Sequence, residues 1–120
     1  MLVNPMIVDG QVIGGVAQGI GTALYEEMPF DAFGQPGATT LADYMLPGAT
    51  EVPTLRISHM ETPSPLTTFG QKGIGEGGAI GPPAAIACAV NDALRPLGAR
   101  VDRLPITPER VLAALAEAAR

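Results

Sequence analysis

The segment of residues 11–27 most constrains the fold, because it has the apolar periodicity of a helix and yet carries four glycines. Its apolar side chains recur three or four positions apart, which places them on one side of a helix. These apolar residues are Ile13, Val16, Ala17, Ile20, Ala23 and Leu24. The glycines are Gly14, Gly15, Gly19 and Gly21. Since each glycine costs about 1 kcal/mol relative to alanine inside a helix, another interaction must offset roughly 4 kcal/mol.

Opposite the apolar side, the expected helix presents an almost bare backbone with one amide side chain. The residues on this side are Gly14, Gly15, Gln18, Gly21 and Thr22. A surface without side chains lets another helix or a ligand come close to the backbone. Two interpretations remain open. Either the glycines pack against a neighbouring element and Gln18 is an ordinary amide, or a ligand lies there and Gln18 contacts it.

A second cluster of glycines occupies residues 70–78, with the sequence GQKGIGEGG. Such a loop offers several backbone N–H groups without side-chain shielding, which suits an anionic or polar ligand. It is not a P-loop, because no Gly-Lys-Ser/Thr follows at the required spacing. It also departs from the dinucleotide-binding fingerprint, because its third glycine comes too early and no helix is expected to begin there.

Two charged side chains distinguish this loop from an ordinary glycine-rich turn. Lys72 is the only lysine in the chain, and Glu76 is the only carboxylate between Glu61 and Asp92. A carboxylate flanked by glycines, in a loop bordered by apolar sequence, is a candidate general base. The alternative is a solvated glutamate in a surface turn, with Lys72 as its ion-pair partner or as a separate surface charge.

The rest of the chain predicts two more helices and a few short strands. One helix is expected over residues 82–94, with prolines in its first turn, and another over residues 108–119, capped by Thr107. The helix of the first segment is expected to have Asp9 as its cap and to end before Pro29. Short strands are expected over residues 40–45, 55–60 and 100–104. The whole chain of 120 residues is therefore expected to form one α+β unit with about three helices.

The single histidine and the single cysteine have ordinary structural interpretations. His59 lies in an expected strand, where a solvent-facing or hydrogen-bonded imidazole is typical. Cys88 falls in an alanine-rich helix and is interpreted as a small buried residue. One cysteine cannot form a disulfide within the chain, and one cysteine with one histidine cannot supply the four ligands of a structural zinc site. No set of metal ligands is therefore expected.

The charge balance excludes several classes of partner. Twelve acidic and seven basic residues give a net charge of −5, and the basic residues are scattered, so neither nucleic acid nor an anionic membrane surface is an expected partner. Glycine, proline or charge interrupts every apolar run well before about 20 residues, so no membrane-spanning helix is expected. The first residues do not resemble a secretory signal, and a lone cysteine fits a reducing compartment. These features predict a cytoplasmic location.

Four stretches of the chain, in this order, resemble one known family. They are VNPMIVDGQVIGGVAQGIGTALYEE, LADYMLPGATEVP, HMETPSP and FGQKGIGEGGAIGPPAAIACAVNDAL. Together they resemble the C-terminal part of the molybdopterin-binding large subunit of the xanthine dehydrogenase and aldehyde oxidase superfamily, and within it the carbon-monoxide-dehydrogenase-like large subunits. The resemblance covers practically the whole chain, which makes it far more specific than either glycine cluster alone.

The resemblance implies roles for residues in both glycine clusters. In this family a KGxGE element carries an active-site glutamate that acts as a base beside the molybdenum, and Glu76 is the matching residue. A GGxxQGIG element carries a glutamine that contacts the molybdopterin, and Gln18 matches it. The backbone of Gly73, Ile74 and Gly75 is implied to approach the cofactor as well. Protein ligands to the metal are not implied, because in this family the pterin dithiolene holds the molybdenum.

The resemblance also implies a larger assembly. Large subunits of the family are several times longer than this chain, hold molybdopterin as such or as its cytosine dinucleotide, and work with iron–sulfur and FAD subunits or domains. The chain is therefore expected to contribute Glu76 and Gln18 to water-dependent hydroxylation, and to be inactive and without cofactor by itself. The alternative is a non-catalytic folding or assembly module that forms a homo-oligomer. The substrate cannot be read from these residues.

Overall fold

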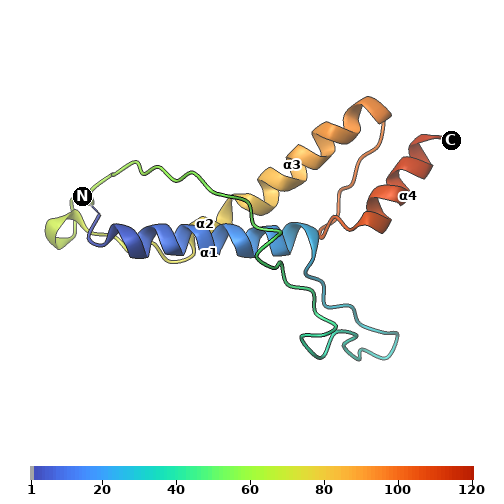
Figure 1. Cartoon of the computed structure of the whole chain (residues 1–120), viewed down its shortest axis with the longest axis horizontal. Helices are drawn as coiled ribbons and strands as arrows, with labels where there is room; N and C mark the ends of the chain where they lie inside the picture. The colour runs from blue at the N-terminus through green and yellow to red at the C-terminus, as the bar shows by residue number, and fades with distance from the viewer. Residues whose placement is uncertain (1) are drawn as a thin grey trace.

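The computed structural model describes residues 2–120, which form helices joined by long irregular connections (Figure 1). The helices are α1 (Pro5–Leu24), α2 (Gly77–Ile80), α3 (Pro82–Leu94) and α4 (Pro108–Ala118), and the two 3-10 turns are η1 (Thr68–Gly70) and η2 (Arg95–Leu97). The predicted helix over residues 82–94 is confirmed. The predicted helix over residues 108–119 is confirmed to within one residue, with Thr107 as its cap.

Helix α1 begins earlier and ends earlier than its apolar pattern predicts. The side chain of Asn4 accepts a hydrogen bond from the Ile7 N–H at 3.2 Å and caps the helix, with Pro5 in the first position. The prediction of Asp9 as the cap is wrong, because Asp9 lies inside the helix. The helix ends at Leu24, well before Pro29, since the chain turns back directly after it.

No β-strand is present within residues 2–120, where the only ladder-like pairing is an isolated bridge between Phe30 and Pro36. The α+β prediction is therefore not confirmed, and the three predicted strands are wrong. Residues 40–45 form a turn, in which the Tyr44 N–H donates to the Thr40 carbonyl at 2.9 Å. Residues 55–60 and 100–104 have the composition of strands, but a strand needs a partner, and these described residues offer none.

The hydrophobic core lies between α3, α4 and the connection that joins them. Its buried residues are Leu94, Ala99, Val101 and Ile106. The side chain of Asn91 in α3 hydrogen-bonds the backbone of this connection, as a neighbouring strand would. Its Nδ2 donates to the Val101 carbonyl and its Oδ1 accepts from the Val101 N–H, both at 2.8 Å. The core joins the end of α1 through Arg110 Nη2, which lies 2.6 Å from Glu27 Oε1.

The described segment is open rather than tightly packed (Figure 1). Its radius of gyration is 18.4 Å, whereas a folded domain of this length has about 14 Å. Its accessible surface is 8936 Å², against about 6,100 Å² for a monomeric protein of this mass. Met60, Leu66 and Phe69 are at least 90% exposed. The segment therefore leaves apolar surface that a larger assembly could cover. No helix within residues 2–120 combines the length and the apolar character that a membrane crossing requires.

Candidate functional site

Helix α1 meets α2 and the start of α3 through its glycines. A Cβ atom on Gly15 would lie 2.6 Å from the carbonyl carbon of Gly78, and one on Gly78 would lie 2.7 Å from the carbonyl oxygen of Val12. Further along α1, a Cβ atom on Gly19 would lie 2.6 Å from the Cβ of Pro82. These approaches leave no room for a side chain at Gly15 or Gly19. The packing interpretation of the glycine surface is therefore confirmed at Gly15, and Gly19 packs in the same manner beside that surface. This close packing offsets their low helix propensity.

The glycine loop of residues 70–78 is tied to α1 by a side chain. Nε2 of Gln11 donates to the carbonyl oxygen of Gly75 at 2.8 Å. Gly75 has a φ of 52°, a left-handed conformation that favours glycine. Among residues 2–120, the backbone N–H groups of residues 72–76 have no hydrogen-bond partner. A Cβ atom on Gly73 or Gly75 would meet nothing within 4 Å, so the loop presents an open row of donors.

Glu76 is the last residue of this row of donors and directly precedes α2. Its carbonyl oxygen accepts from the Ala79 N–H at 2.9 Å, whereas its exposed carboxylate has no hydrogen bond or ion pair with residues 2–120. Lys72 donates instead to Oγ1 of Thr62 at 2.8 Å, so the alternative in which Lys72 pairs with Glu76 is wrong. Helix α2 begins at Gly77, which corrects the expectation that no helix begins at this loop. The carboxylate is left free to contact a ligand or solvent.

Gln18 lies about two turns further along α1 than Gln11. Its Nε2 is 3.1 Å from Oε1 and 3.2 Å from Oε2 of Glu26. The hydroxyl of Tyr44 donates to Oε2 of the same carboxylate at 2.6 Å. This hydrogen bond raises the pKa of Tyr44 above its ordinary value of 10.0, and burial and the negative charge of Glu26 add to the effect. Gln18 is therefore one end of a chain of three hydrogen-bonded side chains.

The single histidine also contacts α1. Nε2 of His59 lies 2.6 Å from Oδ1 of Asp9, which holds residues 55–60 against the helix. The interpretation of His59 as a hydrogen-bonded imidazole is confirmed. Within residues 2–120, no three His, Cys, Asp or Glu side chains come together in a group that could hold a metal ion.

Comparison with known proteins finds relatives of the whole segment. A family model described as a molybdopterin cofactor-binding domain matches residues 1–53. The chain is 47% identical over 114 residues to the nicotine 6-hydroxylase large subunit of Paenarthrobacter nicotinovorans, covering 95% of this chain and 14% of that protein. It is 40% identical over 115 residues to the carbon monoxide dehydrogenase large chain of Hydrogenophaga pseudoflava, covering 96% and 14%. The structure of quinoline 2-oxidoreductase from Pseudomonas putida 86 matches with a TM-score of 0.93 and 52% identity, over 97% of this chain and 15% of that one.

The chain is similar over almost its whole length to one segment of molybdopterin-binding large subunits. The resemblance seen in the sequence is thereby confirmed. This chain spans about one-seventh of the length of the curated relatives named above, because it covers 14% of each.

Sequence reasoning missed three residues that organise this large-subunit segment. Gln11 could have been found, because a separation of seven residues places it on the same helix face as Gln18. Glu26 and Tyr44 left no comparable signal. Their approach to Gln18 depends on where α1 ends and on how residues 40–45 turn, and neither is encoded in a spacing.

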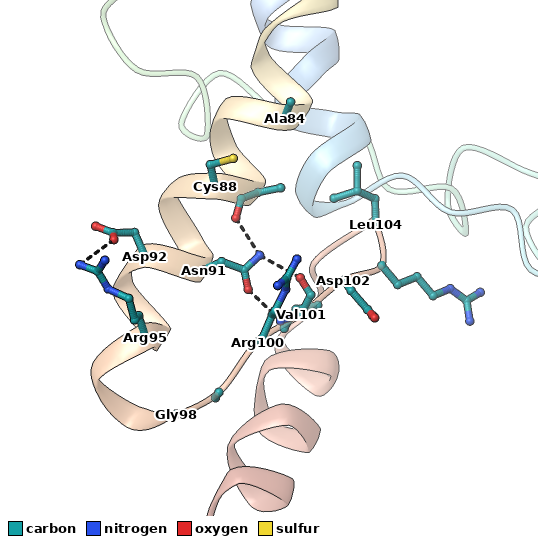
Figure 2. A pocket seen from close by; sticks show the side chains of 13 residues that line it. Ala84, Cys88, Asn91, Asp92, Arg95, Gly98, Arg100, Val101, Asp102 and Leu104 are labelled. Atoms are coloured by element: carbon teal, nitrogen blue, oxygen red, sulfur yellow. Dashed lines mark hydrogen bonds and ion pairs between the residues drawn. The ribbon is translucent and has the colours of Figure 1, made fainter.

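A groove of about 760 Å³ in this large-subunit segment lies between α3 and residues 98–104 (Figure 2). None of the predicted site residues lines it. Cys88 is exposed at this groove, so its interpretation as a buried residue is wrong. Figure 2 shows Asn91 reaching across to Val101 and Arg95 paired with Asp92, which are contacts within the fold. We therefore assign the groove to the architecture of the C-terminal region and the candidate site to α1 and the glycine loop.

Proposed function

We propose that this segment supplies Glu76 as a base and Gln18 as a cofactor contact to the active site of a molybdenum hydroxylase large subunit. The observation that carries the proposal is the placement of a free Glu76 carboxylate at the end of a row of unused backbone donors, which Gln11 ties to the same helix that bears Gln18. The similarity of the chain to a segment of molybdopterin-binding large subunits supports it.

The residues of the loop fit a pterin cofactor. The free N–H groups of residues 72–76 suit polar and anionic atoms, and the open space beside Gly73 and Gly75 lets a ligand approach the backbone. In this proposal the backbone of Gly73, Ile74 and Gly75, together with the side chain of Gln18, would hold molybdopterin, either as such or as its cytosine dinucleotide. When bound, the molybdenum cofactor supplies a two-electron acceptor for the hydroxylation of an electron-poor carbon.

Glu76 would act by accepting a proton. A carboxylate without an internal partner is free to take a proton from water at one of its Oε atoms and to release it afterwards. The glycines on either side leave the carboxylate unshielded and let a substrate come close. Closure of the site against bulk water is left to the rest of the large subunit, because Glu76 is exposed in this segment.

The complete enzyme would include the remainder of the large subunit and iron–sulfur and FAD subunits or domains, and would work in the cytoplasm. The large exposed surface of the segment supports this assembly. Two of the relatives carry the names large subunit and large chain, which belong to multi-subunit proteins.

The test is Glu76→Gln in the assembled enzyme. Turnover should fall at least about a hundredfold, because the amide cannot accept the proton. Molybdenum and pterin content should stay at the wild-type level. Glu117→Gln, which removes an exposed carboxylate from the last turn of α4, is the matched control and should turn over normally. Near-normal turnover of the Glu76 variant would refute its role as the base.

A second candidate function is a non-catalytic assembly module. The open shape and the exposed apolar surface of the segment favour it for the chain on its own. Metal and pterin analysis distinguishes the two, since an active-site segment in its complex should purify with about one molybdenum per large subunit. A cofactor-free, stable homo-oligomer would instead support the module.

A further inference from the structure

The hydrogen bonds around Gln18 deepen the proposed function, on which this inference rests. We propose that Glu26 and Tyr44 are positioning residues that hold the Gln18 amide in one orientation, so that its oxygen remains as the group that contacts the cofactor. Gln18 would then accept a hydrogen bond from an N–H donor of the pterin rather than donate one to an oxygen.

The orientation of the amide follows from the chemistry of its partner. An ionised carboxylate only accepts hydrogen bonds, so Gln18 must turn its NH₂ group, and not its oxygen, toward Glu26. Nε2 lies within 3.2 Å of both carboxylate oxygens, while the amide oxygen has no partner among residues 2–120. Hydrogen bonds to a charged acceptor are about twice as strong as neutral ones. The orientation with the NH₂ group toward Glu26 is therefore favoured over the reversed orientation.

The end of α1 brings Glu26 back onto the helix. The N–H groups of Tyr25 and Glu26 both donate to the carbonyl oxygen of Gly21, at 2.9 and 2.8 Å. This turn lays the Glu26 carboxylate against the buried backbone of Gly21, where an added Cβ atom would collide with it. The turn therefore brings the Glu26 carboxylate within hydrogen-bond distance of Gln18, eight residues earlier in the chain.

Tyr44 fixes the other side of the carboxylate. It lies in the turn of residues 40–45, where its N–H donates to the Thr40 carbonyl at 2.9 Å, and its hydroxyl donates to Oε2 of Glu26 at 2.6 Å. The neighbouring Glu27 forms an ion pair instead, in which its Oε1 lies 2.6 Å from Nη2 of Arg110. The Glu26 carboxylate thus accepts from the Tyr44 hydroxyl of the turn and from the Gln18 amide of α1. Neither of these side-chain groups donates to another carboxylate within residues 2–120.

Two variants of the assembled enzyme test the proposal. Glu26→Gln replaces an acceptor-only group by one that presents either an oxygen or an NH₂ group, so the Gln18 amide can reverse. We expect molybdenum and pterin retention after prolonged dialysis to fall about five- to tenfold, as the loss of one hydrogen bond implies. The Mo(V) electron paramagnetic resonance spectrum of the remaining cofactor should also change. Tyr44→Phe keeps the carboxylate and should lower retention only about twofold to threefold.

Matched controls separate positioning from general stability. Tyr25→Phe removes the other tyrosine hydroxyl, which has no hydrogen bond within residues 2–120, and Glu117→Gln removes an exposed carboxylate. Both should leave retention and spectrum unchanged. If Glu26→Gln lowers the melting temperature but leaves retention and spectrum at wild-type values, the positioning role is refuted.

A titration of the chain itself gives a readout that needs no cofactor. With Tyr25→Phe as the background, the ultraviolet absorbance of tyrosinate reports Tyr44 alone, since the chain has two tyrosines. Adding Glu26→Gln should lower the Tyr44 pKa toward its ordinary 10.0, because the charged acceptor is gone. An unchanged titration would overturn the hydrogen-bond chain.

The outcomes also separate this inference from the proposed function. If Glu76→Gln is inactive with full cofactor and Glu26→Gln behaves as wild type, the positioning proposal fails and the proposed function stands. If the wild-type complex contains no molybdenum while the Tyr44 titration responds as expected, the hydrogen-bond chain stands and the proposed function fails.

Discussion

Two regions of this segment are stabilised by different interactions. At the C-terminal end, α3 and α4 enclose buried apolar side chains, and Asn91 satisfies the backbone of Val101. At the crossing of α1 and α2, backbone lies on backbone at Gly15 and Gly78, and the neighbouring loop keeps its N–H groups unused. The first region is stabilised by buried apolar side chains, whereas the second leaves backbone polar groups without partners, and low local stability is expected there.

The largest effect that sharpens this contrast should come from Asn91→Ala. The change removes three hydrogen bonds, to Ala87 and twice to Val101, and leaves the Val101 backbone groups without partners. The free energy of unfolding should fall by roughly 3 kcal/mol, as urea denaturation can measure. The control is Asp92→Asn on the same helix, which alters only an exposed ion pair with Arg95 and should change stability by less than about 1 kcal/mol. Equal losses in both variants would contradict the importance given to Asn91.

A smaller effect is expected at the helix crossing, from Gly15→Ala. The added methyl would meet the backbone of Gly78 and Ala79, which cannot rotate away, so the loop must move. Stability should fall by about 2 kcal/mol, within the range for overpacked sites. Gly14→Ala is the matched control, because a Cβ atom there meets nothing within 4 Å, and it should gain up to about 1 kcal/mol of helix propensity. A stabilising Gly15→Ala would break the contrast between the two regions.

The smallest effect concerns acid sensitivity at the start of α4. The pKa of Glu109 lies below its ordinary 4.5, because its carboxylate accepts from its own backbone N–H and from Thr107, with Arg110 nearby. The ionised form is favoured in the folded state, so this stabilisation is fully present above about pH 4.5 and is lost as the pH falls through the lowered pKa. Thermal melts between about pH 6 and pH 3 should show a shallower decline in Glu109→Gln than in the wild type. A Glu109→Gln profile parallel to the wild type would contradict this contribution.

The helices were predictable from sequence because their signals are local. Thr107 before Pro108 and the prolines in the first turn of α3 indicate where these helices begin from local sequence alone. The strands were not predictable, because residues 55–60 and 100–104 carry the right residue types and lack a partner among the described residues. Strand formation is a property of a pair of segments, and one segment does not determine it.

In the candidate site, too, local features could be predicted from the sequence and long-range contacts could not. Gln18 and Glu76 stood out in the sequence through their glycine-rich surroundings, and their roles stay predictions. The contacts that surround them join residues far apart in the chain: Gln11 with Gly75, and Glu26 with Tyr44. Such contacts depend on the path of the chain between helices, which neither periodicity nor spacing specifies.

The contact between Gly21 and Glu26 has an evolutionary consequence. Because the carboxylate occupies the space that a side chain at position 21 would need, a substitution at either position changes the effect of a substitution at the other. An alanine at position 21 should be harmful beside Glu26 and less harmful beside a smaller residue, where the tight contact with Cδ of Pro47 at 3.1 Å remains. The two positions are therefore epistatic, and a lineage that loses Glu26 relaxes the strongest constraint on Gly21.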